Sequence, residues 1–457
     1  MKKRHALSGF WAWFLVLAWS LPVLAQNYQI LHQDLDANRH GYTVIRVWGS
    51  HYDMGYAMGA AFADDIAVGW PDIKDQLGAQ YTLARSVIGT TTWLPAGIED
   101  EVNAILAGVK SVHPNIDMDA IDVKLMNTFS DWAYYHGCRS HSCWGSFVAD
   151  PIKTLSTRRL DYGTPFDMAL HHVVCAWDPD DGSPRWVNLA WPGYVAVITA
   201  VNQYGTLSSL HDYGNGAQFP SGSVCRSIAA RYILTGMGDR PLSGHAAWAQ
   251  QELSNLDVAC SSFINYYAPE GHGGVFTCQT GGPCGQLRVP QSDYFNGEVL
   301  ITTNTQTDGH SMPSDDGFMD PYYQQGGVKT LQSHFELMGT GGLHLMSVEY
   351  RAEEDMTIWV QGRGRSDRLE LEWEDLFPAD LPDAGIDAGG QDAGGQDAGE
   401  QDAGGQDAGG QDAGGSDQSQ PGDGDGGGGC GCGSGAGSGS SLVLLMIALA
   451  IIKRRVR

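Results

Sequence analysis

Basic residues are scarce in this sequence. Its 457 residues include 27 Lys and Arg against 53 Asp and Glu, which gives a formal net charge of −26 at pH 7. A surface of this charge repels phosphate backbones and anionic lipid headgroups. We therefore expect no nucleic-acid partner.

Long hydrophobic runs are also missing. An apolar run over residues 10–24 follows the basic start MKKRH, and Val23-Leu24-Ala25 places small residues where a signal peptidase cuts. This run is too short and wrongly flanked for a lasting membrane span. We interpret residues 1–25 as a removed signal peptide and the remainder as exported, where disulfides are permitted.

The tail lacks side chains that could build a core. From Asp387 the pentapeptide DAGGQ repeats, so we interpret residues 381–429 as a disordered, hydrated spacer. Residues 430–457 contain Cys430-Gly431-Cys432, an apolar run and the basic end KRRVR, in the order of a sorting signal. The run over 442–452 falls short of the ~17–25 residues of a spanning helix. A short anchor that is simply retained is the alternative.

Common catalytic motifs are absent as well. The chain has no Gly-x-Ser-x-Gly elbow, and the Gly-rich loop at 271–274 follows no expected strand that would make it a phosphate cradle. We expect no cofactor. His136, Cys138, His141 and Cys143 resemble a soft-metal cluster, but zinc sites normally join ligand pairs from separate turns. We therefore expect no metal ion.

Cysteines number nine, of which two lie in the tail, so the remainder is odd. An exported chain would then keep one thiol or pair it between molecules. Cys278 and Cys284 enclose the turn-rich QTGGP and are expected to form a small disulfide. Two more bridges could join Cys138, Cys175, Cys225 and Cys260 in any of three pairings, which leaves Cys143 as a candidate odd thiol. Parity alone cannot choose it.

Hydrophobic periodicity predicts an α+β fold. Residues 43–48 alternate like a strand, and a helix is expected from Met54, where Gly55 and Gly59 would allow close packing. Further helices are expected at 98–109, 121–132, 224–234 and 244–256. Strands are expected at 142–149, 155–160, 168–177, 186–189, 194–201, 298–303, 343–350 and 356–361, with a turn at 202–205. This order suggests layers around a mainly antiparallel sheet.

Several motifs then follow one another in a fixed order. A cysteine at 143 precedes Arg158-Arg159-Leu160-Asp161, then Asn202-x-x-Gly205, then Thr302-Thr303-Asn304. This order resembles the cysteine branch of the N-terminal nucleophile (Ntn) hydrolases, which includes bile salt hydrolases, isopenicillin N acyltransferases, acid ceramidase and phospholipase B-like proteins. The resemblance covers most of residues 40–362 and implies a four-layer αββα sandwich with mainly antiparallel sheets. The tail resembles MYXO-CTERM tails, which implies processing near Cys430 or Cys432 and display at the cell surface.

The resemblance assigns roles residue by residue. Cys143 matches the nucleophile, Arg158 the arginine that contacts it, and Asp161 the aspartate that engages its α-amine. Asn304 matches the oxyanion asparagine, and Asp212 falls loosely where relatives place a second one. Cys138, twenty residues before Arg158, remains the alternative nucleophile.

Three departures from the family pattern stand beside these matches. Arg159 stands where many relatives have Asn, Gln203-Tyr204 replaces Glu-x in the hairpin, and the late arginine of bile salt hydrolases has no match. The alternative to a catalytic role is that Arg158 and Asp161 form a surface ion pair and that Asn304 simply ends a strand.

The chemistry that these residues offer agrees with the resemblance. A free cysteine is mostly thiol at neutral pH, so it needs a base and positive surroundings. Cleavage of the Ser142–Cys143 bond would expose an α-amine of reference pKa ~7.7 to serve as that base. The expected product is a surface-attached amidase or acyltransferase acting on a small linear amide, with residues 26–142 as its first chain or propeptide and 143–380 as its catalytic part. A non-catalytic surface binding protein on a degenerate fold of this kind, or a phospholipase B-like lipid hydrolase, is the alternative.

Overall fold

The described part of the molecule is a mixed α/β fold with two large sheets. The computed structural model describes residues 27–95, 97–132, 137–162, 166–217, 221–278, 284, 286–303, 319–339 and 341–378. The chain divides into two units, Met1–Ala388 and Gly389–Arg457, and every described residue belongs to the first. Within the described residues no helix is long and apolar enough to cross a bilayer.

The first sheet has nine strands. In spatial order they are β1 (Tyr28–Leu35), β2 (Gly41–Gly49), β5 (His171–Pro179), β6 (Trp186–Ala190), β7 (Thr199–Asn202), β8 (Leu207–Ala217), β9 (Cys260–Tyr267), β10 (Gly274–Cys278) and β11 (Gln286–Arg288). Neighbouring described strands are antiparallel except β2 and β5, which run parallel. The two N-terminal strands, β1 and β2, thus form one edge of a sheet that later segments complete.

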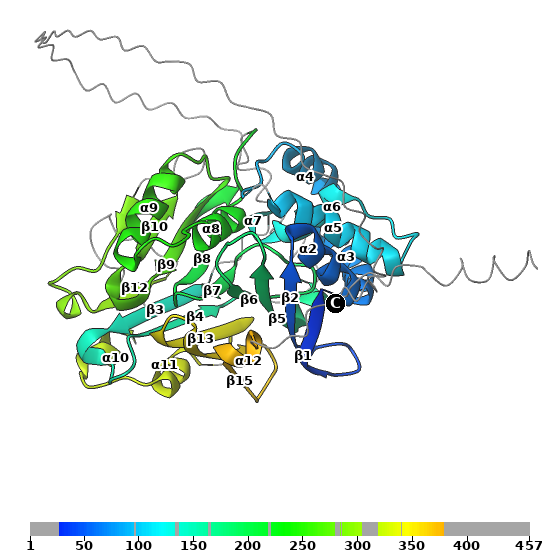
Figure 1. Cartoon of the computed structure of the whole chain (residues 1–457). Coiled ribbons are helices and arrows are strands. Elements are labelled where there is room, and N and C mark those ends of the chain that lie inside the picture. Colours follow the sequence, from blue (N-terminus) through cyan, green and yellow to red (C-terminus); the bar gives the residue numbers. More distant parts are fainter. Residues whose placement is uncertain are drawn as a thin grey trace, which may run out of the picture. The chain divides into compact units, whose positions relative to one another are not determined.

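The second sheet has six strands and is antiparallel throughout its described ladders. Its spatial order is β12 (Val299–Thr302), β3 (Cys138–Trp144), β4 (Thr154–Leu160), β13 (His344–Ala352), β14 (Asp355–Gly362) and β15 (Leu369–Glu372). Figure 1 shows β3 and β4 between β12 and β13, with the first sheet beside them. The predominance of antiparallel pairs agrees with the sequence prediction.

Apolar side chains join the two sheets face to face. Val44 and Val174 of the first sheet share one buried cluster with Met346, Val348 and Ile358 of the second. A different cluster lies between the second sheet and two helices, α10 (Met319–Gln324) and α11 (Leu331–Met338). The second sheet is therefore covered on both of its faces.

Helices also cover the first sheet. They are α2 (His51–Ala61), α3 (Ala63–Leu77), α4 (Tyr81–Ile88), α5 (Gly97–Val112), α6 (Ala120–Asn127), α7 (Phe129–Trp132), α8 (Arg226–Thr235) and α9 (Leu242–Ser254), and α12 (Trp373–Leu376) follows β15. Residues of α2, α3, α5 and α8 share the largest buried cluster with residues of β2 and β5. Figure 1 shows α2, α3 and α5 gathered beside β2.

Glycines set the spacing between α2 and α5. A Cβ atom on Gly55 would lie 2.3 Å from the carbonyl oxygen of Glu101, and one on Gly59 would lie 2.1 Å from that of Ile105. The two backbones can approach this closely only because the side chains are missing. The predicted close packing of this helix is confirmed.

Three of the expected strands differ from the structure by three residues or more. The expected strand over 168–177 begins only at His171, because Asp167–Leu170 form a 3-10 turn. The expected strand over 142–149 begins four residues earlier, at Cys138, and ends at Trp144. The expected strand over 194–201 is reduced to β7, which begins at Thr199. In the residues before Thr199, side-chain amides bind backbone groups that a strand would pair with its neighbour. Asn127 Oδ1 accepts from the Val195 N–H (2.6 Å), and Asn188 Nδ2 donates to the Tyr194 carbonyl (3.2 Å).

Candidate active site

Cys138 is the first residue of β3 and its side chain is buried. The β3–β4 ladder pairs Cys138 with Leu160 and Ser140 with Arg158. Since paired residues, and every second residue, point to one face of a sheet, Cys138, Ser140 and Arg158 share a face. This face is turned toward β8 of the first sheet.

Arg158 connects the thiol to the opposite sheet. Its Nη2 donates to Cys138 Sγ (3.3 Å) and to the Leu210 carbonyl on β8 (2.8 Å). The guanidinium is fully buried. Burial raises the pKa of the Cys138 thiol to about 11, while the charge of Arg158 opposes that rise. The arginine is therefore placed to favour the thiolate.

Cys143 lies on the other face of the same strand. It pairs with Leu155, and its odd separation from Cys138 turns its side chain toward α11. Its Sγ is 3.2 Å from His334 Nε2. Burial raises the pKa of this thiol far above its usual value and lowers the pKa of His334 well below its own. The pair is thus an uncharged thiol against an uncharged imidazole.

The expected contact between Arg158 and Cys143 is therefore replaced by one between Arg158 and Cys138. The sequence spacing allowed either cysteine, but only Cys138 shares a face with the arginine. The α10–α11 side holds Cys143 together with His334 and Tyr323. His141 is also on that side, where its Nδ1 lies 2.6 Å from the Tyr323 hydroxyl.

Gly137 precedes the thiol in a conformation that suits glycine. Its φ is +131°, and an added Cβ atom would lie 2.8 Å from the Cβ of Asp161. The Asp161 N–H donates to the Gly137 carbonyl (2.8 Å). The carboxylate of Asp161 is bound by Arg159, and Arg139 Nη1 lies 3.5 Å from it. Asp161 is therefore close to the residue before Cys138, but its carboxylate is engaged by two arginines.

Asp212 of β8 is buried, and its negative charge raises the pKa of the Cys138 thiol. The Tyr162 hydroxyl donates to Asp212 Oδ1 (3.3 Å), and Arg226 Nη1 lies 2.5 Å from that oxygen. A carboxylate can only accept hydrogen bonds, because it has no N–H to donate. It cannot supply the second oxyanion donor that the resemblance loosely suggested.

The remaining positions that match the family pattern are Asn304 and the turn from Asn202 to Gly205. Asn304 lies outside the described residues; β12 ends two residues before it, with Thr302 opposite Ser140. Asn202 is a turn residue, because its Oδ1 accepts from the N–H groups of Tyr204 (3.2 Å) and Thr206 (3.1 Å). Gly205 has φ +75° in that turn, as predicted.

Arg226, Asp131 and Tyr162 were missed by the sequence reasoning. Arg226 begins α8, and its Nε donates to Asp131 of α7 (2.6 Å). No short motif marks such a pair, since the two residues lie 95 positions apart. Tyr162 directly follows the Arg-Arg-Leu-Asp segment, so adjacency to Asp161 was the available signal.

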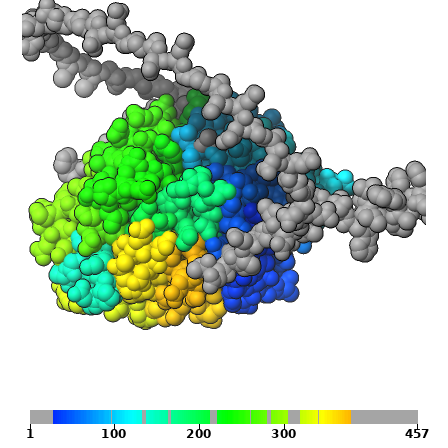
Figure 2. Space-filling model, viewed as in Figure 1, coloured from blue at the N-terminus to red at the C-terminus, as the bar shows by residue number. Residues whose placement is uncertain are grey.

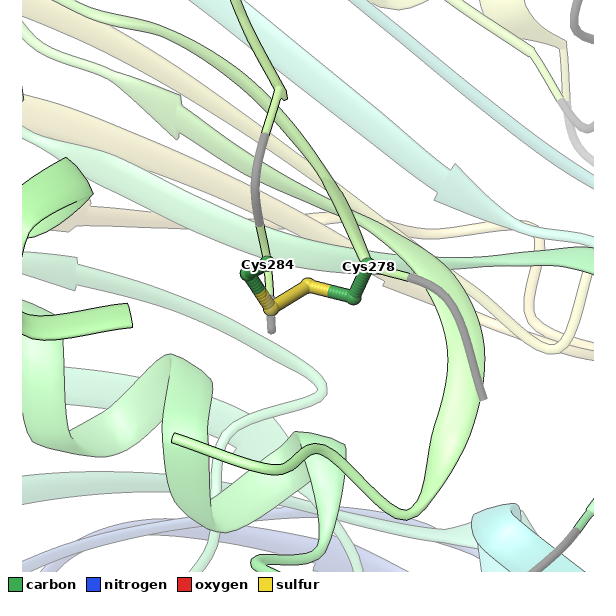
Figure 3. Close-up of a disulfide and its surroundings, with 2 residues drawn as sticks. All are labelled: Cys278 and Cys284. Carbon is green, nitrogen blue, oxygen red and sulfur yellow. A yellow bond between two sulfur atoms is a disulfide. The ribbon is translucent and has the colours of Figure 1, made fainter. Parts of the chain in front are cut away.

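The disulfide prediction is confirmed for Cys278 and Cys284, which are bonded to each other (Figure 3). The described residues contain none of the further bridges proposed among Cys138, Cys175 and Cys225. In the part of the chain that is described, no group of three His, Cys, Asp or Glu side chains is arranged to hold a metal ion. An open depression of about 420 Å³ over α11 and β14 is lined by Phe335 and Gln361 and does not include Cys138.

Comparisons with known proteins give little further guidance. No family model and no curated protein matches the chain. Among solved structures, the chain is similar to a Caenorhabditis elegans N-acylethanolamine-hydrolyzing acid amidase (NAAA) ortholog. The match has 15% sequence identity and a TM-score of 0.37, and covers 46% of this chain and 92% of that chain. A match of this strength does not bear on the chemistry of the site.

Proposed function

We propose that this protein is a self-cleaving cysteine hydrolase of the Ntn type, in which Cys138 is the nucleophile. Its two sheets and two sets of helices would form the four-layer αββα sandwich of that class. The observation that carries the proposal is the contact between Arg158 Nη2 and Cys138 Sγ (3.3 Å) at the first residue of a buried strand. The cut that exposes the nucleophile would then fall at Gly137–Cys138 instead of Ser142–Cys143.

Maturation would use the thiol first against its own chain. The Sγ of Cys138 attacks the Gly137 carbonyl carbon, the C–N bond breaks, and the nitrogen takes a proton to become the α-amine of Cys138. Water hydrolyses the resulting thioester, which leaves a carboxylate on Gly137 and regenerates the thiol. The Asp161 N–H already donates to the carbonyl under attack (2.8 Å), so it is placed to support the developing oxyanion.

Turnover would follow the same chemistry on an external amide. The α-amine, with a reference pKa of ~7.7, takes the thiol proton and later gives it to the leaving amine. Sγ forms an acyl thioester, and Arg158 stabilises the thiolate from which it forms. Asn304 is proposed as an oxyanion donor because it follows β12, whose last residue lies opposite Ser140. Water or a second amine then accepts the acyl group, so hydrolysis and acyl transfer share every earlier step.

The substrate is proposed to be a small linear non-peptide amide. No cofactor takes part in this scheme, and the high negative charge of the chain argues against nucleic-acid or phosphate-rich partners. Cys138→Ala should abolish self-cleavage and covalent capture by an electrophilic amide analogue. Cys143→Ala is the matched control on the opposite face of β3 and should retain both. An active, uncut chain, or loss of activity in Cys143→Ala alone, would contradict the assignment.

Export and surface attachment complete the proposal. Residues 1–25 would be removed as a signal peptide, 26–137 and 138–380 would form the two chains of the enzyme, and 381–429 would hold it away from the cell. Residues 430–457 would be recognised at the membrane by a sorting protease, with attachment through Cys430 or Cys432. Mass spectrometry of the mature C-terminus tests this, because an intact Arg457 on displayed protein would mean that no sorting cleavage occurs.

A further inference from the structure

Arg226 lies inside the molecule between two carboxylates. Its Nε donates to Asp131 Oδ1 (2.6 Å), its backbone N–H donates to Asp131 Oδ2 (3.2 Å), and its Nη1 lies 2.5 Å from Asp212 Oδ1. The side chains of all three residues are at most 1% exposed. Because Arg226 is held by Asp131 through both its backbone and its side chain, the guanidinium has a fixed position.

Asp212 is held from a second direction as well. The Tyr162 hydroxyl donates toward both of its carboxylate oxygens, at 3.3 and 3.4 Å. Tyr162 follows β4, whereas Arg226 begins α8, so the Asp212 carboxylate is contacted from two separate elements. A buried carboxylate with this many donors keeps one orientation.

Asp212 lies on β8 two residues after Leu210, and the Leu210 carbonyl accepts from the same Arg158 Nη2 that donates to Cys138 Sγ. The charges that act on Cys138 are Arg158 from β4, Asp161 just after β4 and Asp212 from β8. Arg226 from α8 and Asp131 from α7 act on Asp212 in turn. The β4 segment, β8, α7 and α8 that carry these groups are brought together only in the folded chain.

We propose that Arg226 is a positioning residue for the Cys138 site: anchored on Asp131, it fixes the Asp212 carboxylate beside the thiol and offsets its charge. The proposal rests on the assignment of Cys138 as the nucleophile. It also gives the segment before the cleavage point a lasting role, because Asp131 belongs to that segment. The residues before Gly137 then act as a permanent part of the enzyme.

The test uses the pH dependence of Cys138 alkylation by iodoacetamide in the purified full chain, followed by mass spectrometry of the Cys138 peptide. Arg226→Gln should move the midpoint to higher pH by about one unit, because the charge of Asp212 is no longer offset. Asp212→Asn should move it to lower pH by a similar amount, about one unit. The double variant should return close to the wild-type midpoint, and Arg226→Lys should stay near wild type.

A merely structural role for Arg226 would change the melting temperature of these variants without moving the midpoint. Unshifted midpoints in folded Arg226→Gln and Asp212→Asn, or shifts of the same sign, would overturn the inference. If Arg226→Gln does not fold, Asp212→Asn still decides the sign, and a midpoint of Arg226→Lys away from the wild-type value would contradict the inference. Wild-type protein whose Cys138 is not alkylated would instead count against Cys138 as the nucleophile.

Discussion

Arg158 and Arg159 provide a matched pair of neighbouring arginines with different expected roles. Arg158 faces the thiol of Cys138, whereas Arg159 lies on the opposite face, where it binds Asp161 and the Met338 carbonyl. We predict that Arg158→Met slows self-cleavage and alkylation of Cys138, while Arg159→Asn leaves both nearly unchanged. Met keeps much of the buried volume and removes the charge.

The size of the Arg158 effect follows from its distance to the thiolate. Two unit charges ~4 Å apart interact by about 4 kcal/mol at an effective dielectric constant of ~20, equivalent to roughly three pKa units. The pKa of the thiol is already raised to about 11 with Arg158 present. Losing the arginine should raise it further and reduce the rates at neutral pH by about 100- to 1,000-fold.

The assay follows freshly translated precursor on denaturing gels, so that zero time is defined. Fragments ending at Gly137 and beginning at Cys138 report cleavage, and N-terminal sequencing of the second fragment fixes the site. Thermal unfolding of each variant controls for folding, because substitution of a buried arginine can also change stability. If Arg158→Met cleaves within tenfold of wild type while Arg159→Asn fails, the reasoning about the two faces of β4 is wrong.

Three further predictions test the same reading of the structure. Gly137→Ala should block self-cleavage, because Gly137 has φ +131° and an added Cβ would collide with the Cβ of Asp161. The control Gly182→Ala, at a glycine with φ +82° and no atom within 4 Å of the added Cβ, should cleave normally, and equal cleavage of the two variants would contradict a conformational requirement at Gly137. After cleavage the two chains should co-elute under native conditions, because Glu101 before the cut pairs with Arg231 after it in a buried ion pair (2.5 Å), and separation without denaturant would refute this. The hydrogen bond and charge of Glu101 raise the pKa of His51. The stabilisation of the fold by this pair is therefore complete below the unfolded pKa of ~6.5 and is lost as pH rises through the folded pKa. His51→Gln should lower the melting temperature more at pH 5.5 than at pH 9, and an equal loss at both would refute the pairing.

The sequence was most informative where one face of an element is exposed or where a turn has a fixed chemistry. The hairpin at Asn202 and the small loop between Cys278 and Cys284 were predicted because glycine and asparagine suit turns. The helix expected from Met54 was predicted from its apolar spacing; in the structure it begins three residues earlier, at His51, after a capping box between Ser50 and Asp53. Each of these signals is local and needs no knowledge of the partner element.

The start of β3 could not be predicted in the same way. Of its seven residues, CRSHSCW, two are cysteines, four are polar and only Trp144 is a large apolar residue, yet the strand is buried almost along its whole length. A strand covered on both faces carries no alternation of apolar and polar residues. Without a strand boundary, the faces of Cys138 and Cys143 could not be assigned, so the sequence could not show which of the two cysteines contacts Arg158.

The scarce basic residues are used inside the molecule as well as on its surface. Arg158, Arg226 and Arg231 are all at most 2% exposed. Arg231 donates to Glu101 and lies over the ring of Trp186 (4.8 Å), away from the contacts made by Cys138, whereas Arg158 contacts the thiol and Arg226 its neighbour Asp212. Burying an ion pair gives little net stability, but removing one partner leaves a buried charge that is strongly destabilising. The three arginines should therefore differ in the property that their loss changes. Loss of Arg231 should act on folding and chain association, whereas loss of Arg158, or of Arg226 through Asp212, should act on the reactivity of the Cys138 thiol.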